Sequence, residues 1–201
     1  YRVDGTPSVQ VCSPPSAWRN VHCHWNPSTS IAPPGFDARH SAVAREYRYT
    51  VVNRPVPDPF RASFAWHIAE PLDLRAMQAA CDGLIGEHDF TSFCRRPQAE
   101  GASLIRRIHE AEWTDEGEGV LRFTIRASAF CHQMVRSVTG TLVDIGRGKR
   151  RAADVLDIIR ARDRSAASQP APPHGLCLWR VDYPPDAGFA SDGTRPADQK
   201  A

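Results

Sequence analysis

The sequence predicts an α+β fold, in which a mainly antiparallel sheet carries its helices on one face. Segments with alternating apolar residues are interspersed with segments of helical periodicity. Two of the alternating segments are neighbours, separated only by a short turn rich in glycine and acidic residues, which is typical of a hairpin. The expected order of elements is β-α-β-β-α-α-β, and this order indicates the α+β class.

The first expected elements are a strand over residues 46–52 and an amphipathic helix. EYRYTVV alternates and is rich in aromatic and β-branched residues, as a half-buried strand requires, and it places Tyr47 and Tyr49 on one face. Asp73 should cap the helix, because its carboxylate can accept from the first free amides. We expect Gly86 to end it. The apolar residues on its buried side are Leu74, Met77, Cys81 and Leu84.

The rest of the pattern predicts a hairpin, two helices and a closing strand. SLIRRIHEAEW (103–113) and VLRFTIRAS (120–128) should pair antiparallel across the turn TDEGEG. Apolar residues between 130 and 145 recur at helical spacing and predict a helix with a wide buried stripe. AADVLDIIRAR (152–162) predicts a shorter helix, and GLCLWRVDY (175–183) predicts the last strand.

Composition limits the classes of protein to which the chain can belong. Its 201 residues are 41% hydrophobic, which is enough for a real core, and 25 Lys+Arg against 23 Asp+Glu leave a net charge of +2. Any nucleic-acid surface must therefore be local. No apolar run has membrane-spanning length and no leader is evident, so we expect a soluble, cytoplasmic chain. The six cysteines form no CxxC pair and favour free thiols in a reducing compartment.

The chain divides into three zones. Residues 1–32 mix proline, tryptophan, cysteine and histidine without periodicity, and we expect them to be unstructured. Residues 33–184 carry the fold. Residues 185–201 have the composition of a disordered tail. The sequence begins with Tyr1 rather than Met, which is compatible with processing or with a sequence that starts partway through a protein.

Arg136 lies beside the buried stripe of the helix over 130–145. An unpaired buried guanidinium is costly, so this arginine either turns to solvent, with a surface ion pair as the simpler alternative, or has a specific anionic partner. Tyr47 and Tyr49 on an open sheet face would be suited to stacking on a base, although aromatic residues at period two are more often core. The run RGKRR (147–151) is the better phosphate candidate, with Arg147 and Lys149 as its predicted contacts, although most such runs are solvated surface.

Other candidates have simpler structural explanations. Cys12 with the run His22-Cys23-His24 suggests zinc only weakly, because adjacent residues point in different directions and no second pair is suitably spaced. Cys131 beside His132 is better explained as a core thiol than as a nucleophile. The acid/base residues Glu87, His88 and Asp89 are better explained as a charged turn.

Four segments in order resemble the C-terminal half of the tRNA pseudouridine synthase A family, also called TruA. The resemblance covers residues 33–183, about three quarters of the chain. The segments are GFDARHSAVAREYRYTVVN (35–53), LDLRAMQAACDGLIGEHDFTSFCRR (72–96), FCHQMVRSVTGTLVDIGRGK (130–149) and APPHGLCLWRVDY (171–183). Four ordered segments are far more specific than a single motif.

The resemblance implies a pseudouridine synthase lobe that acts on tRNA. Members of the family are homodimers without metal or organic cofactor, and they isomerise uridines on the 3′ side of the anticodon stem-loop, at tRNA positions 38–40. We expect the chain to bind neither membrane nor DNA. An aspartate in an RTDAGVHA-like motif is the nucleophile. The resemblance implies that Arg136 pairs with this aspartate and that Tyr47 stacks on the target base.

The chain departs from the family at the nucleophile, since it contains no RTDAGVHA. The nearest string is YRVDGTPS, which keeps Arg2 and Asp4 without the turn that follows in the family. The abrupt loss of pattern over residues 1–32 favours a different reading frame or a truncated gene. We therefore expect the chain to be inactive alone, with Asp4 as its candidate nucleophile. The alternatives are a non-catalytic RNA-binding or dimerisation module derived from the family, and a metal-dependent module using the region from Cys12 to His24.

Overall fold

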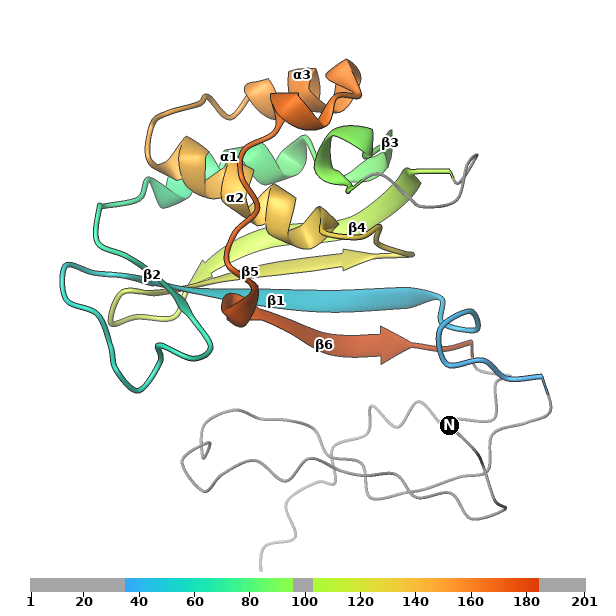
Figure 1. Ribbon diagram of the computed structural model, residues 1–201, viewed down its shortest axis with the longest axis horizontal. Helices are drawn as coiled ribbons and strands as arrows, with labels where there is room; N and C mark the ends of the chain where they lie inside the picture. The colour runs from blue at the N-terminus through green and yellow to red at the C-terminus, as the bar shows by residue number, and fades with distance from the viewer. Residues whose placement is uncertain (1–34, 96–102, 185–201) are drawn as a thin grey trace, which may run out of the picture. The chain divides into compact units, whose positions relative to one another are not determined.

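The computed structural model describes residues 35–95 and 103–184. Within these residues it forms a six-stranded sheet with three α-helices on one of its faces (Figure 1). The predicted α+β class is therefore confirmed. The expectations for residues 1–32 and for the tail 185–201 fall outside the described residues. Across residues 35–95 and 103–184, every helix is too short or too polar to span a bilayer.

The sheet is antiparallel except for one short parallel pair. Its order is β2 (Trp66–Ile68), β1 (Ala44–Asn53), β5 (Val120–Ala127), β4 (Ile105–Asp115) and β3 (Gly86–Asp89). The last strand, β6 (Leu176–Asp182), pairs with the first half of β1, whereas β2 pairs in parallel with the end of β1. The predicted hairpin is present as β4 and β5. Strand β1 is therefore central, with β5 on one side and both β2 and β6 on the other.

Helix α1 (Leu74–Asp82) begins as predicted and ends early. The Asp73 carboxylate caps it by accepting from the backbone N of Ala76 at 3.0 Å. The helix stops at Gly83, so the prediction that it continues to Gly86 is wrong. Gly86 has a φ of +107° and opens the next strand instead, a backbone conformation that glycine adopts without steric penalty.

Two short strands were not predicted. β2 has three residues and β3 has four, too few for an alternating pattern to be recognised. The prediction of a charged turn at Glu87, His88 and Asp89 is therefore wrong, because these residues form β3 and pair with β4. A short polar strand at the edge of a sheet is a common way to keep the edge from pairing with another chain.

The core lies between the sheet and helix α2 (Met134–Gly146). This helix is buried on almost every side, including the hydroxyl residues Thr139 and Thr141, which donate back to backbone carbonyls of the helix. The sheet covers one side of α2, and the segment between α3 (Asp154–Ala161) and β6 covers another side, because it runs across the helix as Figure 1 shows. A β-carbon on Gly140 would lie 2.0 Å from the carbonyl oxygen of Gln169, so only glycine permits this approach.

The aromatic face of β1 is the covered face of the sheet. Tyr49 is fully buried in the core and Tyr47 is half-buried. Tyr49 therefore has the core role that aromatic residues at this spacing more often have, and Tyr47 alone of the two keeps part of its side chain exposed. The sequence could not decide this, since an alternating strand does not reveal which of its faces the helices cover. The opposite face carries ion pairs such as Arg48 with Glu46 at 2.9 Å and Arg126 with Asp182 at 2.8 Å.

Candidate active site

A pocket of about 420 Å³ lies where the start of α2 meets strand β1. Its lining comes from the turn before β1, from β1 itself, from the segment that leads into α2 and from the start of β6. Tyr47 and Arg136 both line it, so the structure brings together the two residues that the resemblance singled out. The lining residues include a second arginine, Arg39, and no aspartate or glutamate. The pocket is therefore cationic and partly aromatic.

Arg136 is held by neutral acceptors. Its Nε donates to the carbonyl oxygen of Ala171 at 2.6 Å, and its Nη1 donates to Oε1 of Gln133 at 2.7 Å. Among the residues that the structure describes, no carboxylate forms an ion pair with it. The positive charge thus faces the pocket, oriented but not neutralised, which favours an anionic group as its ligand.

Tyr47 is fixed from the side by Phe130. The two rings meet edge to face, with centroids 5.1 Å apart and an interplanar angle of 88°. Such a contact holds the orientation of an aromatic ring and stabilises it beyond its buried area. Because Tyr47 lines the pocket and is half-buried, part of its side chain remains available to a bound molecule.

Tyr49 helps to hold the segment that orients Arg136, a role that the sequence did not predict. Its hydroxyl donates to the carbonyl oxygen of Pro172 at 2.7 Å, next to the Ala171 carbonyl that holds Arg136. Burial raises the pKa of Tyr49 well above its ordinary value, although the nearby positive charge of Arg136 acts in the opposite direction. Two consecutive carbonyls therefore anchor the tyrosine and the arginine.

Arg39 and Leu176 also line the pocket and were given no role by the sequence. Arg39 lies in a turn that Asp37 organises, since the Asp37 carboxylate accepts from the backbone N of Arg39 at 2.8 Å and of His40 at 2.7 Å. These amide hydrogen bonds lower the pKa of Asp37. Both pocket residues fall within segments that carry the family resemblance, which was the only available signal for them.

Arg147 and Lys149 lie at the opposite end of α2. Eleven residues of helical rise place Arg147 about 16 Å from Arg136. Arg147 pairs with Glu70 at 3.4 Å and with Asp144 at 3.7 Å, and Lys149 also pairs with Asp144 at 3.7 Å. Acidic side chains from α2 and from the chain after β2 therefore act as counterions for these two residues, and their predicted role as phosphate contacts stays a prediction.

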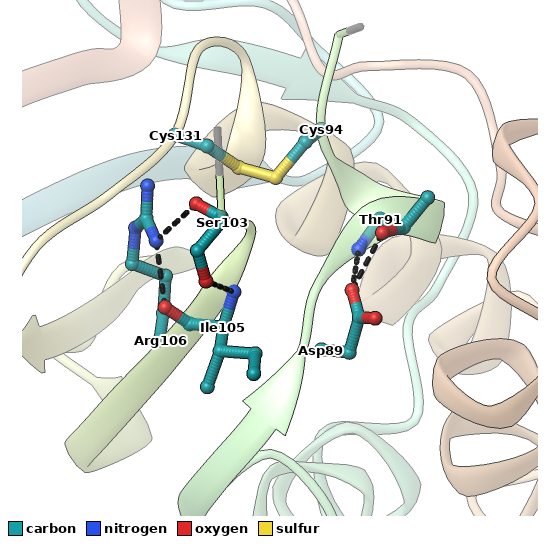
Figure 2. The surroundings of a disulfide bond; sticks show 7 residues. All are labelled: Asp89, Thr91, Cys94, Ser103, Ile105, Arg106 and Cys131. Atoms are coloured by element: carbon teal, nitrogen blue, oxygen red, sulfur yellow. Dashed lines mark hydrogen bonds between the residues drawn. A yellow bond between two sulfur atoms is a disulfide. The ribbon is translucent and has the colours of Figure 1, made fainter. Parts of the chain in front are cut away.

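Cys131 is not the free thiol that its sequence context predicted. A disulfide joins it to Cys94, with the two Cα atoms 5.8 Å apart (Figure 2). Cysteine usage therefore gives no support for a reducing compartment. Cys81 is a buried free thiol, as expected, and burial raises its pKa to about 12. Asp4 and the zinc candidates from Cys12 to His24 lie outside the described residues.

The fold and the pocket together define a lobe suited to binding an anionic, planar ligand, and comparison with known proteins identifies its class. A family model described as tRNA pseudouridine synthase matches residues 80–184, just over half of the chain. The chain belongs to the tRNA pseudouridine synthase family.

Three similar proteins are each named tRNA pseudouridine synthase A. That of Bacillus velezensis is 44% identical over 156 residues, which are 78% of this chain and 62% of the relative. The Bacillus subtilis protein is 44% identical over 76% of this chain and 61% of its own length. The Streptomyces griseus protein is 43% identical over 80% of this chain and 56% of its own length. The chain thus spans about three fifths of the length of these relatives.

Proposed function

We propose that this chain carries the uridine-binding lobe of a tRNA pseudouridine synthase that acts on the anticodon stem-loop, at positions 38–40. The observation that supports this most is the shared pocket, in which Tyr47 and the unneutralised Arg136 face the same space. A flipped-out uridine needs an aromatic surface for its ring and cations for its phosphates, and this pocket offers both.

Arg136 acts on the nucleophile. Pseudouridine formation breaks the glycosidic bond, turns the uracil and rejoins it to the ribose through carbon 5. An aspartate that attacks must stay ionised within a partly dry pocket, and a guanidinium beside it lowers the pKa of the carboxyl group. Because Arg136 is already oriented by Gln133 and Ala171, it can receive such a carboxylate without reorganising.

Tyr47 stacks on the uracil ring and handles its proton. Its ring is held by Phe130, so stacking loses little side-chain entropy. Tyr47 lines the same pocket as Arg136, so its hydroxyl can serve the same bound uridine. This division of roles requires no metal or organic cofactor, because the carboxylate, the guanidinium and the phenol supply all the groups that the isomerisation uses.

The nucleophile comes from outside the described residues, since no carboxylate lines the pocket within them. Asp4 is the candidate in this chain. We propose that the chain alone does not catalyse the reaction, and that the complete enzyme is a cytoplasmic homodimer with a second lobe. The alternative is a non-catalytic RNA-binding or dimerisation module that keeps Tyr47, Arg136 and the basic run RGKRR.

The test is pseudouridine formation in an unmodified tRNA transcript by the purified chain and by the Asp4→Ala and Arg136→Ala variants. Circular dichroism first establishes that each protein is folded. We expect no product from the chain alone, together with binding of the anticodon stem-loop. Product that disappears in both variants would contradict the proposed inactivity and establish Asp4 as nucleophile. Folded chain that binds no stem-loop would contradict the proposed RNA-binding role.

Arg147 and Lys149 remain predicted phosphate contacts in this proposal. When the stem-loop binds, RNA phosphates must then replace Glu70 and Asp144 as the ion-pair partners of these two residues. If Lys149 contacts one phosphate, Lys149→Gln should lower the slope of log affinity against log salt by about 1. An unchanged slope would remove Lys149 from the RNA interface.

A further inference from the structure

The segment Phe130–Gln133, named here the pocket wall, positions both proposed site residues. At one end of the wall the Phe130 ring packs edge to face on Tyr47, and at the other end the Gln133 amide accepts from Arg136. Between them lies Cys131, bonded to Cys94. Whatever holds or releases Cys131 therefore acts on the placement of both Tyr47 and Arg136.

We propose that Cys94 and Cys131 form a reversible thiol–disulfide site that controls the pocket, with small thiols and small disulfides as its reactants. The consequence for uridine binding rests on the proposed function. The control of the wall itself does not, because it follows from the contacts of Phe130, Cys131 and Gln133 alone.

Cys94 lies on a segment that other contacts anchor to the core. Cys94 follows the 3-10 turn η1 (Thr91–Phe93), whose Phe93 is fully buried and whose Ser92 hydroxyl donates to the carbonyl of Ile158 in α3. Figure 2 shows the bond leading from this turn to Cys131, and the Asp89 carboxylate accepting from Thr91 at the start of the turn. The disulfide thus ties the wall to a part of the core that is anchored independently.

The wall keeps a second connection to the same segment. The backbone N of Arg95 donates to the carbonyl oxygen of His132 at 2.9 Å. This hydrogen bond keeps the two segments side by side when the disulfide is opened, so the thiols can find each other again. Reduction should therefore loosen the wall without unfolding the lobe.

The two sulfurs differ in access. Cys94 is only 2% exposed, whereas Cys131 is partly exposed and lines the pocket. A small dithiol enters there, and its thiolate attacks the sulfur of Cys131. A new bond forms between the reductant and Cys131, and Cys94 leaves as a thiolate and takes up a proton. The second thiol of the reductant then displaces the Cys131 thiol and closes the reductant into a cyclic disulfide. A small disulfide drives the reverse sequence and leaves as two thiols.

Hydrogen exchange of the full 201-residue chain without RNA, in the presence or absence of dithiothreitol, tests whether the disulfide restrains the pocket wall. We expect at least tenfold faster exchange in peptides covering residues 129–137 after reduction, and unchanged exchange in the hairpin of β4 and β5. Cys131→Ser should match the reduced protein under both conditions. Cys177→Ser, which leaves the pair intact, should match the wild type. Melting curves establish that each variant is folded.

Three results would overturn the proposal. Alkylation of both Cys94 and Cys131 in protein pretreated with oxidised glutathione would show that the bond does not form. Unchanged exchange over residues 129–137 after complete reduction would show that it does not hold the wall. Stem-loop RNA bound equally by both forms would show that it does not control the pocket. Absence of RNA binding in both forms, with the exchange difference present, would instead contradict the proposed function and support control of the wall.

Discussion

The arginines at the two ends of α2 have different surroundings. Arg136, in the first turn, donates to the neutral oxygens of Gln133 and Ala171 and faces the pocket. Arg147, just past the last turn, pairs with Glu70 and Asp144. By sequence both arginines were candidate ligand sites, Arg136 as the partner of an anionic group and Arg147 as a phosphate contact in a basic run. The structure favours the first, since an arginine held by neutral acceptors keeps its charge for a ligand, whereas one paired with carboxylates must first exchange partners.

Trp66 is a further contact of Arg147 and distinguishes its surroundings from those of Arg136. Its ring lies under the guanidinium of Arg147, 5.5 Å from centroid to the carbon Cζ. That contact and the two ion pairs make Arg147 part of the surface packing between α2 and the chain around β2. The pocket end of α2, in contrast, is built around one cation and the groups that orient it. The following predictions test this contrast, beginning with the largest effect.

Gly140→Ala should destabilise the lobe by about 3 kcal/mol. The new β-carbon would lie 2.0 Å from the Gln169 carbonyl oxygen and would push away the segment that holds Arg136. Beyond the C-terminal end of α2, a β-carbon on Gly148 meets nothing within 4 Å, and Gly148→Ala should cost about 1 kcal/mol for its positive φ. Urea unfolding of both variants measures the difference. Equal losses would contradict the close packing at Gly140.

Tyr47→Ala should weaken binding of the anticodon stem-loop by about 2 kcal/mol, or roughly thirtyfold, through loss of stacking. Tyr47→Phe keeps the ring and should bind within about twofold of the wild type. Fluorescence anisotropy with a labelled stem-loop gives both affinities. If the alanine variant binds as well as the phenylalanine variant, Tyr47 does not stack on the RNA.

Tyr49→Phe should destabilise the lobe by about 1 kcal/mol at pH 8, because the carbonyl of Pro172 loses its donor. Folding favours the protonated phenol, since the pKa of Tyr49 is raised in the folded state. The stabilisation that arises from this raised pKa is fully present below the ordinary pKa of 10 and is lost as the pH rises above it. Unfolding at pH 8 and pH 11 should therefore show a steeper alkaline loss for wild type than for Tyr49→Phe. Identical slopes would contradict the burial of the hydroxyl.

Arg147→Gln should change the melting temperature by at most about 2 °C, since its partners are near the surface and screened by water. Part of this small effect should disappear in 0.5 M salt, which screens the ion pairs. A large loss of stability that persists in high salt would show that Arg147 is a core element, and would remove the contrast between the two ends of α2.

The sequence predicted the long elements of the fold because periodicity is clear over eight or more residues. The strands β2 and β3 were missed since three or four residues carry no period. The sequence could not decide which face of β1 is covered, because Tyr47 and Tyr49 alternate equally well against helices or solvent. The pairing of Cys94 with Cys131 spans 37 residues, and no local pattern reports a contact at that separation. Periodicity drew attention to Tyr47 and Arg136, but their roles came only from the family resemblance, and their common pocket required the fold.

The most direct test of the uridine site uses a chimera that joins the N-terminal half of the Bacillus subtilis relative to residues 33–201 of this chain. Pseudouridine formed in a tRNA transcript is measured for the chimera and for its Arg136→Gln and Arg147→Gln variants. We expect an active chimera, a loss of about a hundredfold or more in kcat/KM for Arg136→Gln, and a loss of no more than about tenfold for Arg147→Gln, as one phosphate contact would give. Full activity of Arg136→Gln would contradict the assignment of this pocket as the active site.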